Sequence, residues 1–84
     1  MANTMRRRLT LSAHLEMFGI ENKDLQVAAW DIGIEKGALQ RALAGQAISQ
    51  PDAQAICTWL SRKHGIEKDG FVPGDIPGLA IWTP

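Results

Sequence analysis

The chain has one cysteine and lacks any apolar run that could cross a bilayer. Cys57 has no second cysteine to pair with, so an internal disulfide is excluded. A membrane span needs about 18 or more consecutive apolar residues, and none is present. The segment after the N-terminal arginines is interrupted by Thr10, Ser12 and His14, which makes it too polar for a signal-peptide core. These absences favour the reducing cytoplasm, in a bacterium its cytoplasm or nucleoid, with no membrane partner.

The sequence also lacks the residue patterns that carry catalysis or hold a metal. It has no paired carboxylates, Ser/His/Asp set or glycine-rich phosphate loop, and 84 residues leave little room for a catalytic pocket. His14 and His64 do not stand at metal-ligand spacing from each other or from Cys57. We therefore expect no enzyme, no metal site and no cofactor.

Charge of either sign is in balance, but it is unevenly placed along the chain. Residues 1–8 carry Arg6, Arg7 and Arg8 and no acid, whereas residues 9–33 have a net charge of −3. Residues 34–64 have a net charge of +2, and residues 65–84 of −2. A neutral total argues against tight binding to nucleic acid by bulk electrostatics, so any such binding needs base contacts or dimerisation.

Three segments follow from the composition: a basic arm at 1–8, a helical domain at 9–65, and a tail at 66–84. Helices are predicted at about 9–18, 23–32, 35–44 and 50–64, with Asn22 capping the second and Ser49 the fourth. The tail is rich in proline and glycine, which excludes a long helix there. Its two apolar runs, 71–72 and 79–82, either wrap the core or form a short strand that meets the same strand of a partner.

The most informative stretch is 25–43, LQVAAWDIGIEKGALQRAL, which predicts two short amphipathic helices joined by a tight turn. Gly33 stands where a helix end favours positive φ, and Ala29 is small where the second helix must cross the first. The apolar stripes are Leu25, Ala28, Ala29 and Ile32 in the first helix, and Ile34, Ala38, Leu39, Ala42 and Leu43 in the second.

Together with the flanking helix ends at Gly19 and Gly45 and the fourth helix begun by Pro51, this stretch resembles the Cro/repressor (lambda-repressor-like, XRE-type) helix-turn-helix family over about 9–66. The resemblance implies an all-α fold, a four- to five-helix bundle, to which this chain adds an extended Pro/Gly-rich tail with a possible short β-strand. Two departures are the bulky Trp30 and Gly37, which costs a helix about 0.5–1 kcal/mol relative to alanine.

The resemblance further implies that the second helix of this pair enters the major groove of DNA. Its outward residues would then contact DNA, with Gln26 on a phosphate: Glu35, Lys36, Gly37, Gln40 and Arg41. Arginine can donate two hydrogen bonds to guanine, and glutamine can pair with adenine. For Lys36, Gln40 and Arg41 the alternative is an ordinary solvated helix face, and we favour DNA contact.

Other basic residues are less telling. Arg6, Arg7 and Arg8 are equally an arm on DNA or a plain polar terminus. Arg62 and Lys63 more often complement the dipole at a helix end than contact DNA.

Dimerisation is expected because one recognition helix reads few base pairs. Trp59, Leu79, Ile81 and Trp82 are the candidate interface residues, with core filling as the alternative for Trp59. The sequence thus predicts a homodimeric repressor of phage or plasmid type on a palindromic operator in double-stranded DNA, with no small-molecule effector. The alternative is an antitoxin-type or other protein-interaction module on the same scaffold, with a tail that masks a partner.

Overall fold

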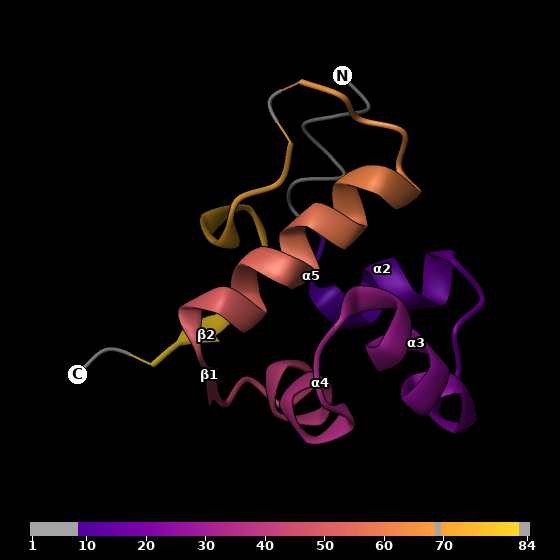
Figure 1. Ribbon diagram of the computed structural model, residues 1–84, viewed down its shortest axis with the longest axis vertical. Coiled ribbons are helices and arrows are strands. Elements are labelled where there is room, and N and C mark those ends of the chain that lie inside the picture. Colours follow the sequence, from indigo (N-terminus) through magenta and orange to yellow (C-terminus); the bar gives the residue numbers. More distant parts are fainter. Residues whose placement is uncertain (1–8, 69, 83–84) are drawn as a thin grey trace.

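The computed structural model describes residues 9–68 and 70–82, and this part of the chain is mostly helical, as predicted. Figure 1 shows the long helix α5 crossing the molecule, with the shorter helices α2, α3 and α4 gathered at its side and the tail returning past it. The helices are α2 (Leu11–Met17), α3 (Leu25–Ile32), α4 (Lys36–Leu43) and α5 (Gln50–Lys63). Short 3-10 turns, η1 (Asn22–Asp24) and η2 (Pro73–Asp75), and two strands, β1 (Ala47–Ile48) and β2 (Ala80–Ile81), complete it. Within these described ranges, no helix has both the length and the apolar character of a bilayer span.

Polar side chains fix where the helices begin. The hydroxyl of Thr10 accepts a hydrogen bond from the Ala13 N–H at 3.2 Å, and that of Ser49 accepts from Asp52 at 3.3 Å. The predicted cap at Ser49 is therefore confirmed. The predicted cap at Asn22 is wrong, because Asn22 lies inside η1. There the Asp24 carboxylate accepts the Glu21 N–H instead, at 3.0 Å.

A left-handed glycine links α3 to α4. Gly33 has φ +96°, and its N–H and that of Ile34 both donate to the carbonyl of Ala29, at 2.8 and 3.0 Å. Ala29 is fully buried, so its small side chain lets α4 pack closely against α3. The apolar stripes predicted for both helices lie in the core, except that Leu43 is only half-buried.

The tail folds back onto its own chain. Phe71 and Ile76 are buried in the core, and the Phe71 N–H donates to the hydroxyl of Ser61 at 2.9 Å. Strand β2 pairs in parallel with β1, which sets Ala80 beside Ala47 and Ile81 beside Ile48. Of the two alternatives left by the sequence, wrapping of the core is what is found, and the predicted strand pairs within the chain.

Trp59 lies in the core and not at an interface, which corrects the assignment made from sequence. Its side chain is 1% exposed, and its ring meets that of Phe18 edge-on at 5.7 Å between centroids. The indole N–H donates to the Asp31 carboxylate at 2.5 Å, so the polar atom is satisfied inside the chain. The buried face of α5 is wider than its aliphatic stripe suggests. A side chain with no exposed surface has nothing to offer a second molecule.

Candidate nucleic-acid interface

Helix α4 has one apolar and one polar face. Ala38, Leu39 and Ala42 are buried at 4% exposure or less, and they anchor the helix. The remaining residues at the start and on the other side of the helix face outward: Glu35 as N-cap, Lys36, Gln40 and Arg41 are exposed, and Gly37 is half-exposed. The structure thus brings the sequence-predicted α4 residues together on one accessible surface, which we call the α4 face.

Arg41 bends back along the helix toward Gly37. A Cβ built on Gly37 would lie 3.7 Å from Nη1 of Arg41, which is an ordinary van der Waals distance. The guanidinium therefore lies about one helical turn before its own Cα, beside Gly37. Its donors are presented toward the N-terminal end of α4.

Gln26 is exposed at the second position of α3, as a phosphate contact would need. The same helix end holds the Asp24 carboxylate, which is the N-cap of α3 and accepts the Glu21 N–H. Its negative charge offsets the positive end of the helix dipole, which weakens the attraction of this helix end for an anion. The predicted arm residues Arg6, Arg7 and Arg8 lie outside the described residues.

Arg62 and Lys63 are directed at the end of α3. The Lys63 ammonium lies 3.9 Å from the Asp31 carboxylate and 5.8 Å from the Trp59 ring centroid. Arg62 donates to the Asp31 carbonyl at 3.5 Å. These contacts support the structural interpretation of the two basic residues, since both hold the end of α5 against α3.

The structure pairs two histidines that sequence spacing kept apart. Nδ1 of His14 and Nε2 of His64 are 2.9 Å apart, and the rings of Phe18 and Phe71 lie against both. The signal that was missed is the position of His14 on the apolar stripe of its helix, between Leu11 and Phe18. Among the described residues, no group of three or more His, Cys, Asp or Glu side chains could hold a metal ion.

The Cys57 thiol is buried beneath the tail. Burial, and to a lesser extent the nearby charge of Asp75, raises the pKa of Cys57 from 9.0 to about 11. The thiol is therefore fully protonated at neutral pH and a poor nucleophile.

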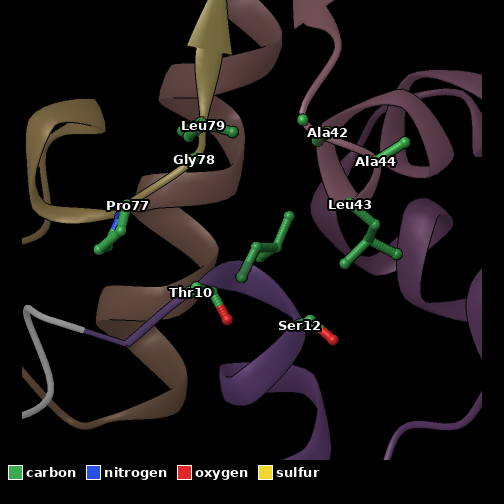
Figure 2. Close-up of a pocket in the computed structure, with 10 residues that line it drawn as sticks. Thr10, Ser12, Ala42, Leu43, Ala44, Pro77, Gly78 and Leu79 are labelled. Carbon is green, nitrogen blue, oxygen red and sulfur yellow. The ribbon is translucent and has the colours of Figure 1, made fainter.

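The surface is hollowed in several places. One hollow, drawn in Figure 2, lies between the start of α2, the end of α4 and the tail at Pro77, Gly78 and Leu79, and has a volume of about 230 Å³. None of the described residues lining it has an ionisable side chain, so it offers no acid or base for chemistry. A second hollow, a groove of about 420 Å³ between α3 and α5, has an apolar floor with Asp24, Asp31 and Lys63 at its rim.

The tail residues predicted to mediate dimerisation differ in exposure. Leu79 and Ile81 are half-buried against the core of their own chain. Trp82 follows β2 and is 63% exposed. Its backbone is held in place, because its backbone N–H donates to the Ile48 carbonyl at 2.7 Å. Trp82 is thus the large side chain that this end of the tail offers to a second molecule.

The fold and the α4 face define a small helical domain that presents one polar helix surface. A scan against protein-family models, and searches of curated proteins and of solved structures, found no match to this chain.

Proposed function

We propose that the chain is a sequence-specific DNA-binding regulator of helix-turn-helix type, acting as a homodimeric repressor on a palindromic operator. The observation that carries the proposal is the α4 face. Three buried residues anchor this helix in the core. Its accessible side carries Lys36, Gln40 and Arg41. The turn at Gly33 and the buried Ala29 fix α4 against α3, and in a helix-turn-helix the second helix of such a pair enters the major groove.

The side chains of the α4 face supply donors and acceptors that suit base edges. Arg41 can donate two hydrogen bonds to O6 and N7 of guanine, and Gln40 can pair with N6 and N7 of adenine. Glu35 can accept from the amino group of cytosine, and Lys36 provides a flexible charge for a phosphate. With zero net charge over the whole chain, these contacts must carry the selectivity.

A single α4 face reads too few base pairs for tight binding, so two copies are proposed to act together. Trp82, with Leu79 and Ile81 behind it, is the proposed contact between them. An exposed tryptophan on a fixed strand end is a strong anchor for an interface. Repression then follows from occupancy of promoter DNA.

The test is selection from a pool of random duplexes, followed by binding measurements on variants. We expect the wild type to enrich one symmetric sequence. Arg41→Ala should bind that sequence at least about tenfold more weakly, because a bidentate arginine–guanine contact contributes about 1–3 kcal/mol. Arg62→Ala is the matched control, since it removes the same charge from α5 and should change the affinity little. If no sequence is enriched by the wild type, the proposal fails.

A second candidate function, a protein-interaction module, is favoured by a different observation. Val27 and Trp30 on α3 are 65% and 72% exposed, and Val27 also lines the groove between α3 and α5. At the rim of that groove the two carboxylates, Asp24 and Asp31, outnumber Lys63, and this balance suits a basic partner protein better than a phosphate backbone. Selection from random duplexes separates the two functions: enrichment of one symmetric sequence by the wild type supports the DNA-binding regulator, and no enrichment supports the interaction module. If the α4 face is the functional surface, Trp30→Ala should leave that enrichment unchanged.

A further inference from the structure

Gly37 occupies a position where nothing inside the described chain requires a glycine. It is the second residue of α4 and has an ordinary helical backbone, and a Cβ built there would lie 3.7 Å from its nearest neighbour, Nη1 of Arg41. Alanine would fit there and would favour the helix, because glycine is a poor helix former. The residue therefore lowers the stability of α4 without an internal reason.

Most other glycines of the described chain have such a reason. Gly70 packs against Ser61, where a Cβ would come within 2.6 Å of the hydroxyl oxygen. Five more have positive φ: Gly19, Gly33, Gly45, Gly65 and Gly78. Gly74 alone shares with Gly37 an ordinary φ and room for a side chain, but it lies in η2, on the tail and outside the α4 face.

Local rules broken without structural need tend to mark functional positions. Here the break falls in the middle of the α4 face, with Nη1 of Arg41 3.7 Å from the place that a Cβ of Gly37 would take. We propose that Gly37 is a specificity-determining residue: its bare Cα lets α4 approach the base edges closely, and the Arg41 guanidinium beside it reads the adjacent base pair. This inference rests on the proposed function, because it requires that the α4 face enters the major groove.

Close approach has a defined consequence for sequence preference. A methyl group added at position 37 would stand between the helix and the base pair that it faces, while the guanidinium keeps its place at van der Waals distance. The base preference should therefore change at one or two adjacent positions of the site. Phosphate contacts, which carry no sequence information, should be unaffected.

The experiment compares wild type, Gly37→Ala and Gly74→Ala in thermal unfolding and in binding to the selected duplex and to a scrambled duplex. Gly37→Ala should raise the unfolding midpoint by about 2–8 °C and weaken binding to the selected duplex at least about tenfold. Its binding to the scrambled duplex should not change. Gly74→Ala should keep both affinities of the wild type. A more stable protein that binds its site less well is a combination that a purely structural glycine would not produce.

Three results would overturn the inference. A lower unfolding midpoint for Gly37→Ala would show that the fold itself needs the glycine. Equal affinity and an unchanged base preference would show that no close approach occurs there, and would leave the proposed function intact. Failure of the wild type to prefer any duplex would remove the proposed function and this inference together.

Discussion

At the scale of single residues, Asp31 is the junction between α3 and the end of α5. Its carboxylate accepts a hydrogen bond from the indole N–H of the buried Trp59. The same carboxylate forms an ion pair with Lys63, and the backbone carbonyl accepts a hydrogen bond from Arg62. The ammonium and the carboxylate of the Lys63 pair are both about half exposed, so solvent screens that pair. We attribute most of the stabilisation at this junction to the indole hydrogen bond.

Replacement of Asp31 separates the two contributions. Asp31→Ala leaves the indole N–H without its acceptor and should lower the free energy of unfolding by about 1 kcal/mol. Asp31→Asn keeps an acceptor oxygen and should lose less than half as much. Urea denaturation followed by circular dichroism measures both. An equal loss in the two variants would mean that the charge, and not the hydrogen bond, is what matters.

Cys57 makes stability depend on pH on the alkaline side. Because the pKa of the thiol is about 11 in the folded chain and 9.0 without burial, folding favours the protonated form. This stabilisation is complete below pH 9 and is lost as the pH rises from 9 to 11, by about 2 kcal/mol. Unfolding midpoints of the wild type should therefore fall more steeply over that range than those of Cys57→Ala. Parallel curves for the two proteins would contradict the shift.

At the scale of elements, the link between α3 and α4 was predictable because local chemistry determines it. Glycine is the residue that tolerates the left-handed backbone at position 33, and periodic apolar residues set both buried faces. The start of α3 was not predictable in this way. Asn22 and Asp24 are both good capping residues, and which of them precedes the helix depends on the backbone geometry at Glu21. The α4 face was predicted by the same periodicity that places its anchors in the core.

The turn itself can be tested through Gly33. A Cβ there would meet nothing within 4 Å, so Gly33→Ala costs only the left-handed backbone of a non-glycine residue. We expect a loss of about 1–2 kcal/mol, which lowers the thermal midpoint of an 84-residue chain by several degrees. A midpoint equal to that of the wild type would show that the turn does not hold position 33 in the left-handed region.

At the scale of the whole molecule, the sequence could not show which distant segments meet. Three contacts join segments more than 30 residues apart in the sequence. They are the pairing of His14 with His64, the packing of Phe71 against His14, and the pairing of β2 with β1. Such contacts depend on the global arrangement of the helices and leave no periodic signal. For the same reason the sequence could not decide between an interface and the core for Trp59: its cover comes from Phe18, the C-cap of α2, and from Asp31 of α3.

The packing of the tail also decides how dimerisation should be tested. Removal of residues 66–84 would strip Phe71 and Ile76 from the core and unfold the domain along with any interface. Trp82→Ala changes a side chain that is 63% exposed and should leave the unfolding midpoint of the monomer nearly unchanged. Sedimentation should show a dimer for the wild type and a monomer for the variant. A variant that remains dimeric would place the interface elsewhere.

The central claim is that the α4 face recognises DNA by sequence, and one ratio tests it most directly. That ratio is the affinity for the selected duplex divided by the affinity for a scrambled duplex of equal length, at one physiological salt concentration. For the wild type the account predicts a ratio of at least about 10³, and for Arg41→Ala a ratio at least about tenfold smaller. A ratio near one for the wild type would contradict it.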